Sequence, residues 1–237
     1  MSNKQQGSTV SWIIIGMVVG LLVSLFIYNQ ANRPPVENPH LGNEWNAGMS
    51  IGNADAPNKF VEYSDYFCPY CSELKKATDD PDYKKDYIDS GKVRHETRII
   101  TVLKDMIPNT EQGAEAAFCA ADQNKFYEYS QHIVPRIQTE YFDKGIGTKN
   151  VANPVPIPLL PLSYFTSSAI AVGMDVEEFN SCMSGDKHSE KIRQDTQKAI
   201  SAGVTGLPYI VVNDYKTSGF MGGYDGLKTV LKAGGVE

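Results

Sequence analysis

The first long apolar stretch of the chain runs from Val10 to Tyr28 without a single charge. As an α-helix it would be about 28 Å long, close to the roughly 30 Å hydrocarbon core of a bilayer. Trp12 and Tyr28 lie near its two ends, where amphipathic rings favour the membrane interface. The pattern predicts one transmembrane anchor over residues 10–28, and a buried core helix or a cleaved signal peptide are the alternatives.

The polar segments on either side of this stretch predict how the chain is oriented. Residues 1–9 carry Lys4, and the positive-inside rule weakly favours placing them in the cytoplasm. Residues 29–46 contain Pro34, Pro35 and Pro39 and have no apolar period, which indicates an extended linker. We therefore expect a single-pass protein of the cell membrane whose soluble domain, residues 47–237, lies outside the cytoplasm.

Short β-branched or aromatic runs alternate with helical periods in residues 47–237. Strands are predicted at 59–64, 92–100 and 209–213, and Phe220 and Met221 are expected to begin another. Helices are predicted after residue 68 and at 111–130, 164–172, 176–183, 189–202 and 225–233, with a proline-rich loop over 143–161. The order is β-α-β, a helical block over about 105–200, and β-β-α, which indicates an α/β fold.

Composition narrows the function classes. The chain has 237 residues, of which 41% are hydrophobic, so it is long and apolar enough for a core and is not a disordered chain. Four cysteines are too few for a disulfide-dense mini-protein. The net charge of −6 argues against nucleic-acid binding, which favours a basic surface.

Cys68 and Cys71 carry the clearest chemistry, because two cysteines separated by two residues at the start of a helix can form and break a disulfide. Pro69 suits the first helical position, which places Cys68 at the helix N-terminus. The helix dipole and the free N–H groups there favour a thiolate on Cys68, and Cys71 would resolve the mixed disulfide. A zinc site or a purely structural disulfide are the alternatives, and no metal or other cofactor is expected.

Three ordered stretches of the chain carry a family resemblance: residues 51–71, which include Phe60-Val61-Glu62-Tyr63-Ser64 and Cys68-Pro69-Tyr70-Cys71, residues 114–129, and residues 203–213. Together they resemble a membrane-anchored DsbA-like protein of the thioredoxin superfamily. The resemblance covers about residues 48–235. It implies a thioredoxin-like fold with an inserted helical domain, preceded here by the transmembrane helix.

The resemblance also implies roles for single residues. Pro208 matches the cis-proline that faces the active-site disulfide, and Leu207 before it would offer backbone groups to an extended substrate. Glu62 matches a buried acid that would accept a proton from Cys71. The dipeptide Pro69-Tyr70 departs from the Pro-His of strong oxidants, and a neutral tyrosine stabilises a thiolate less, so we expect a less oxidising couple.

The activity that the resemblance implies is thiol–disulfide exchange through Cys68 and Cys71, forming disulfides in cysteine-containing exported proteins. A quinone-linked membrane partner would reoxidise the pair. A disulfide isomerase or reductase of the same fold, or a glutaredoxin-like enzyme, are the alternatives within the same class. The alternative from another class is a non-catalytic thioredoxin-fold protein, either a copper chaperone or a holdase.

Cys119 and Cys182 remain if Cys68 pairs with Cys71, since four cysteines allow three pairings. Both lie in predicted helices of the inserted block. A structural disulfide between them is expected if the domain lies outside the cytoplasm, and two buried free thiols are the alternative.

Overall fold

The computed structural model describes residues 6–31, 49–147 and 155–237, and within the first range it describes the side chains of residues 12, 14–25 and 28. The chain divides into two compact units, Met1–Asn38 and Pro39–Glu237. Residues 1–5 and most of the predicted linker, from residue 32, lie outside the described residues.

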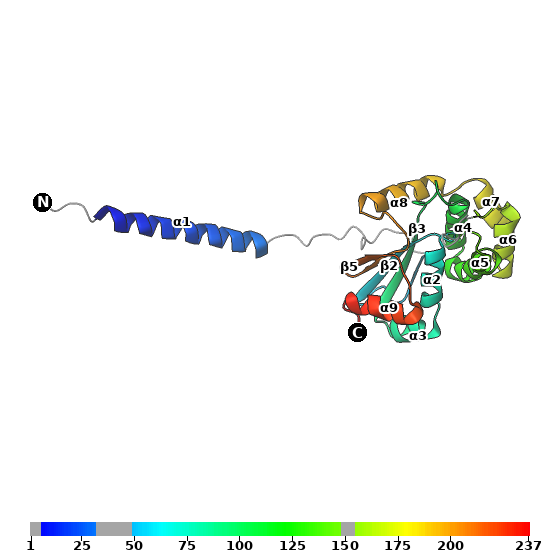
Figure 1. Ribbon diagram of the computed structural model, residues 1–237, viewed down its shortest axis with the longest axis horizontal. Coiled ribbons are helices and arrows are strands. Elements are labelled where there is room, and N and C mark those ends of the chain that lie inside the picture. Colours follow the sequence, from blue (N-terminus) through cyan, green and yellow to red (C-terminus); the bar gives the residue numbers. More distant parts are fainter. Residues whose placement is uncertain (1–5, 32–48, 148–154) are drawn as a thin grey trace. The chain divides into compact units, whose positions relative to one another are not determined.

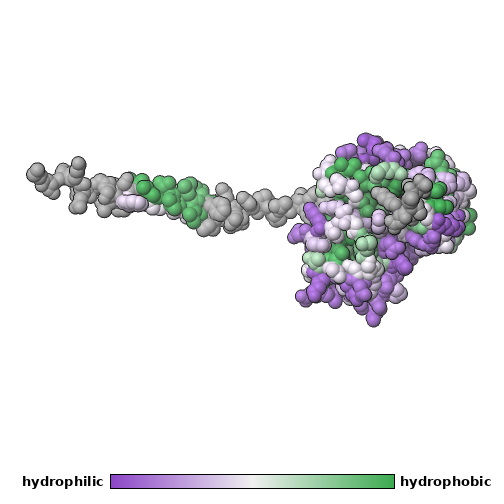
Figure 2. Space-filling view, viewed as in Figure 1, coloured by the Kyte–Doolittle hydropathy of each residue, from purple (hydrophilic) through white to green (hydrophobic). Residues whose placement is uncertain are grey.

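The first unit contains helix α1, Gln6–Ala31, which includes the whole of the predicted anchor. Its described side chains are largely apolar and exposed, from Trp12 to Tyr28, and they form the hydrophobic surface visible on this helix (Figure 2). Among the described residues, no helix combines the length and the apolarity needed to cross a bilayer.

The second unit is built on a sheet with the strand order β1-β3-β2-β4-β5. The strands are β1 (Ser50–Ile51), β2 (Asn58–Ser64), β3 (Val93–Ile99), β4 (Tyr209–Val212) and β5 (Tyr215–Ser218). β2 and β3 are parallel, and the other neighbouring pairs are antiparallel. The strands predicted at 59–64, 92–100 and 209–213 are therefore confirmed, and β1 is an additional edge strand.

Alternating side chains of the strands build separate cores on the two faces of the sheet. On one face, helices α2 (Pro69–Thr78) and α9 (Gly223–Ala233) cover β2 and β4 (Figure 1). Buried there are Phe60, Leu74, Ile210, Val212, Leu227 and Leu231. On the other face, Ala199 of α8 (Ser189–Ser201) packs with Val61 and Val211. Each large apolar side chain buried in this way contributes about 1.5–3 kcal/mol to folding.

The inserted block between β3 and β4 is helical, as predicted. It comprises α4 (Thr110–Asp122), α5 (Phe126–Glu140), α6 (Leu162–Ala171), α7 (Val176–Ser184) and α8. A 3₁₀ turn, Phe142–Lys144, opens the proline-rich loop, of which residues 148–154 lie outside the described residues. Between β2 and β3, α2 is followed by α3 (Pro81–Tyr83) and a π-helical turn, Lys84–Asp89.

Two predicted elements need correction, and backbone turns explain both. The strand after β4 is Tyr215–Ser218, not Phe220–Met221, because Asn213 adopts a left-handed φ of 52° and Val212 pairs directly with Tyr215. The helix expected over 111–130 is two helices, because Asn124 takes φ 54° and the Lys125 N–H donates to the Ala120 carbonyl at 2.8 Å, closing α4.

Candidate active site

Cys68 and Cys71 lie at the start of α2, directly after the loop that leaves β2. Cys68 is the N-cap with an extended backbone, and Pro69 occupies the first turn, as the sequence predicts. The N–H groups of Cys71 and Ser72 both donate to the Cys68 carbonyl, at 3.0 and 3.1 Å. Both cysteines are free thiols, and each is only 2% exposed, so Cys68 is as buried as Cys71.

The segment before β4 lies against the Cys68 sulfur. The peptide bond between Leu207 and Pro208 is cis, and the Cys68 thiol donates to the Leu207 carbonyl oxygen at 3.7 Å. Pro208 is buried, and its carbonyl accepts the Gly219 N–H at 2.8 Å, which ties this segment to the end of β5. The fold therefore brings Cys68 against the Leu207-Pro208 segment, although Leu207 follows Cys68 by 139 positions in the sequence.

The buried position of Cys71 sets its acidity. Burial, and next the neighbouring Cys68 sulfur, raise the pKa of the Cys71 thiol well above its usual value. In the reduced protein Cys71 is therefore a neutral thiol near pH 7. Cys68, at the helix N-terminus, is the sulfur placed to act as the nucleophile.

Glu62 is buried on β2, on the sheet face that α2 covers. It is 2% exposed, its Oε1 accepts the Thr97 hydroxyl at 2.9 Å, and the same oxygen lies 3.6 Å from the His95 Nε2. Burial favours the protonated carboxyl, but the His95 imidazole and the Thr97 hydroxyl outweigh it and hold the pKa of Glu62 below its usual value. The expected buried acid is thus in place, with Cys71 lining the same small cavity.

Asp65 is a second buried acid at this site, and the sequence reading did not single it out. It lies in the loop between β2 and α2, is 2% exposed, and its Oδ1 accepts the Phe67 N–H at 2.8 Å. Burial raises the pKa of Asp65 to about 6, and the Phe67 N–H and the Thr110 hydroxyl offset only part of this effect. In the sequence, the one feature that pointed to Asp65 is its position as a carboxylate among the aromatic residues directly before Cys68.

Helix α4 of the inserted block holds this loop in place. A Cβ on Gly113 would lie 2.9 Å from the Phe67 ring, so the absence of a side chain there lets α4 approach the loop closely. Tyr66, next to it, shares a 2.6 Å hydrogen bond with the Ser130 hydroxyl of α5. The inserted helices therefore position the residues that precede Cys68.

Comparison with known proteins places this site in a family. The family model described as thioredoxin matches residues 44–233, which is most of the chain. The chain belongs to the thioredoxin family. A probable disulfide bond formation protein D from Bacillus anthracis is 28% identical over 207 residues, covering 85% of each protein. Within the thioredoxin family, the chain is a DsbA-like thiol:disulfide oxidoreductase.

Solved structures show the same thioredoxin-family fold. The crystal structure of BdbD from Bacillus subtilis, in its oxidised form, aligns with a TM-score of 0.59 at 18% identity and covers 78% of this chain and 91% of that one. Wolbachia pipientis alpha-DsbA1 aligns with a TM-score of 0.60 at 19% identity, covering 87% and 96%. The α/β fold with a helical insertion is therefore shared with both proteins.

The dipeptide between the two cysteines of this thioredoxin-family site has an exposed member. Pro69 is half-buried, whereas the Tyr70 side chain is 41% exposed at the start of α2. A tyrosine in this position has no positive charge to offer the Cys68 sulfur. The dipeptide is also open to contact with a substrate.

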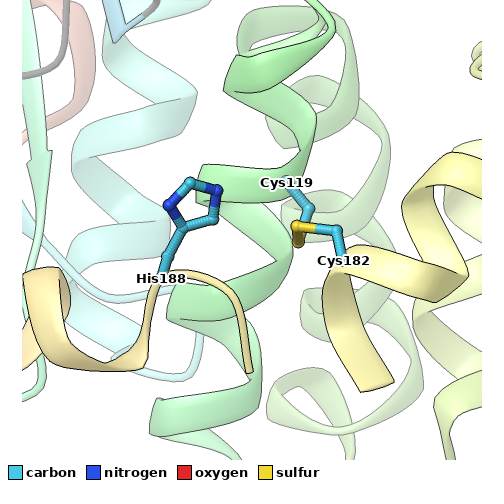
Figure 3. A group of neighbouring side chains, drawn as sticks. All are labelled: Cys119, Cys182 and His188. Atoms are coloured by element: carbon cyan, nitrogen blue, oxygen red, sulfur yellow. A yellow bond between two sulfur atoms is a disulfide. The ribbon is translucent and has the colours of Figure 1, made fainter. Parts of the chain in front are cut away.

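Cys119 and Cys182 form a disulfide that joins α4 to α7 in the inserted block (Figure 3). The ring of His188 lies beside it, with one nitrogen and both sulfurs within 4.8 Å of one another. Asp122 holds that ring through a 2.8 Å contact to Nε2. Because each sulfur is bonded to the other, neither is the thiolate that a metal ion would need, and the group is a disulfide flanked by an imidazole.

Proposed function

We propose that this protein forms disulfide bonds in cysteine-containing exported proteins, donating the Cys68–Cys71 disulfide by exchange. The observation that carries the proposal is the contact of the Cys68 sulfur with the Leu207 carbonyl that precedes Pro208. A backbone carbonyl at that point is suited to pair with the main chain of an extended substrate, while the sulfur of the substrate cysteine lies against Cys68. The relatives named above support the same direction of exchange.

The proposed reaction has two steps. A substrate thiolate attacks the Cys68 sulfur of the oxidised protein, the new S–S bond forms, and the Cys68–Cys71 bond breaks, so that Cys71 leaves and takes up a proton. A second substrate thiolate then attacks the substrate sulfur of this mixed disulfide and releases Cys68 as a thiolate. The substrate is oxidised, the protein is reduced, and a quinone-linked membrane partner returns it to the disulfide form.

The proposed location of the reaction is the outer side of the cell membrane, with the chain held there by residues 10–28. The support is the uncharged run in α1, the Cys119–Cys182 disulfide and the polar linker in the sequence. Disulfides persist in oxidising compartments, so a protein that carries one for stability and a second for catalysis fits such a compartment.

Replacing Cys71 with alanine is the direct test of the proposal. In the variant the Cys68 thiolate can still attack a disulfide of a substrate protein, which forms a mixed disulfide and frees one substrate thiolate. Cys71 is absent and cannot release the bound substrate, so mixed disulfides between Cys68 and substrate proteins are expected to accumulate in cells. They are detected as reductant-sensitive bands on gels and identified by mass spectrometry. The trapped proteins should be exported ones. Recovery of cytoplasmic proteins alone, or no trapped species, would contradict the proposal.

The reduction potential of the Cys68–Cys71 couple distinguishes an oxidant from a reductase. We expect a value of about −120 to −180 mV, because the helix N-terminus stabilises the reduced form while the neutral Tyr70 adds no positive charge. Equilibration with glutathione buffers, followed by trapping of the free thiols, measures it. A value near that of thioredoxin, about −270 mV, would identify a reductant instead.

A further inference from the structure

Cys71 needs a proton in a place that water does not freely reach. It is 2% exposed, and when it leaves the disulfide its sulfur carries a full negative charge among buried groups. An unneutralised buried charge is strongly unfavourable, so the bond breaks readily only if a proton arrives with the electron pair. A buried acid near the sulfur can supply this proton.

A small cavity connects the Cys71 side chain to two such acids. Its volume is about 10 Å³, which is close to the space that one water molecule needs. The titratable residues that line it are Glu62, Asp65, Tyr66, Cys71 and Lys75. The residues contributed by α5 are Phe126, Ser130 and Val134, none of which titrates. Both carboxyl groups and the Cys71 side chain therefore line one small cavity.

The two acids differ in how strongly their carboxyl groups are engaged. Glu62 is tied to Thr97 through Oε1 and faces His95, and these two residues keep it ionised. The Asp65 Oδ1 accepts the Phe67 N–H, and its buried Oδ2 has no hydrogen-bond partner, which is also true of Glu62 Oε2. Burial raises the pKa of Asp65 to about 6, so this carboxyl group can gain and lose a proton close to neutral pH.

Asp65 is also coupled to the cysteine pair. Its backbone carbonyl accepts the Cys68 N–H at 3.1 Å, which fixes the loop to the start of α2. Its negative charge is one of the influences that raise the pKa of the Cys71 thiol, although burial is the largest. Glu62 is not among the main influences on Cys71. The Asp65 backbone acts in the opposite direction and lowers the pKa of the Cys71 thiol through a hydrogen bond, so the loop of Asp65 lies directly beside Cys71.

We propose that Asp65 is the proton partner of Cys71, giving its proton to the sulfur as the Cys68–Cys71 bond breaks and taking it back when the bond forms. The S–S electron pair goes to the Cys71 sulfur, the proton goes from Asp65 Oδ2 to that sulfur, and Asp65 becomes a carboxylate. The inference rests on the exchange reaction proposed above. Glu62 then sets the local charge without carrying the proton.

The test is the pH profile of disulfide cleavage in the full-length oxidised protein and in Asp65→Asn. Asparagine keeps an oxygen for the Phe67 N–H but cannot donate a carboxyl proton. Cleavage is started with excess dithiothreitol and followed by rapid alkylation, and the rates are corrected for the thiolate fraction of the reagent. The native protein should become faster as the pH falls through about 6. Asp65→Asn should lack this inflection and be roughly hundredfold or more slower below it.

Glu62→Gln is the matched control, and it should keep the inflection near pH 6. If Glu62→Gln removes the inflection and Asp65→Asn keeps it, Glu62 carries the proton and the proposal about Asp65 is wrong. An unchanged profile in Asp65→Asn would also overturn it. If the native protein cleaves no faster than a free disulfide, the exchange function itself fails, which is a separate result.

A stability titration separates this role from a purely structural one. A carboxyl group whose pKa is raised on folding stabilises the protein below its unfolded pKa, 3.8, and that contribution is lost as the pH rises through about 6. The native protein should therefore lose stability relative to Asp65→Asn across this window. A difference between the two proteins that does not change with pH would contradict the buried, protonatable Asp65 on which the proposal depends.

Discussion

Replacing Cys68 with serine is expected to reduce thiol–disulfide exchange to the uncatalysed background. A hydroxyl group cannot form the S–S bond of the mixed disulfide, and Cys71 cannot take over because burial raises the pKa of its thiol. The assay is the oxidation of a reduced two-cysteine protein by the oxidised full-length chain, followed by loss of free thiols.

The serine variant also decides between catalysis and binding. Serine is close in size to cysteine and sits at an N-cap, where it is a favoured residue, so the fold should be preserved. Cys71→Ser is the matched control, because its Cys68 thiolate can attack a substrate that contains a disulfide and should form a mixed disulfide with it without releasing it. If Cys68→Ser fully retained the cellular function, the protein would be a holdase, and the oxidoreductase mechanism proposed for it would be wrong.

The sheet was largely predictable from the sequence because its strands alternate in a local pattern. Val61 and Tyr63 point to one face while Phe60 points to the other, and such a period can be read directly from residues 59–64. The strand after β4 was misplaced because its position depends on Asn213, whose left-handed backbone makes a two-residue turn. Asparagine tolerates that conformation, but the residue type alone does not require it.

The active site was predictable only in part, for a related reason. Cys68 and Cys71 are recognisable because their spacing and helix position are local features. Pro208 and Glu62 required resemblance to a family. Asp65 was not predicted because its burial depends on long-range packing. Helix α4 approaches the loop before Cys68 at Gly113, and Phe126 of α5 lines the cavity. Burial that distant helices produce cannot be read from a short stretch of sequence.

Loss of the Cys119–Cys182 bond is expected to lower the free energy of unfolding by about 4 kcal/mol. The bond joins residues separated by 63 positions, and closing a loop of that length removes much of the freedom of the unfolded chain. For a domain of this size, the melting temperature should fall by roughly 8–16 °C. Unfolding by denaturant, with and without a reductant, measures the difference.

The measurement should be made in a Cys68→Ala/Cys71→Ala background. The chain has four cysteines, so this variant retains only the pair Cys119 and Cys182, and the reductant then acts on one bond. The same protein without reductant is the control, and alkylation with mass spectrometry confirms each redox state. Identical unfolding curves for the two states would contradict the prediction.

Hydrogen exchange in different parts of the domain shows whether the disulfide acts on the unfolded chain or on the native helices. Phe179 of α7 is buried against Tyr129 of α5, with ring centroids 5.5 Å apart, so the block has apolar packing between its helices in addition to the disulfide. If the bond acts mainly on the unfolded chain, hydrogen exchange through global unfolding should speed up equally in the sheet and in α4–α7. If exchange accelerates only in α4 and α7, the bond instead holds the native helices together. We expect the first result, because the contacts around Cys119 and Cys182 are already those of a well-packed core.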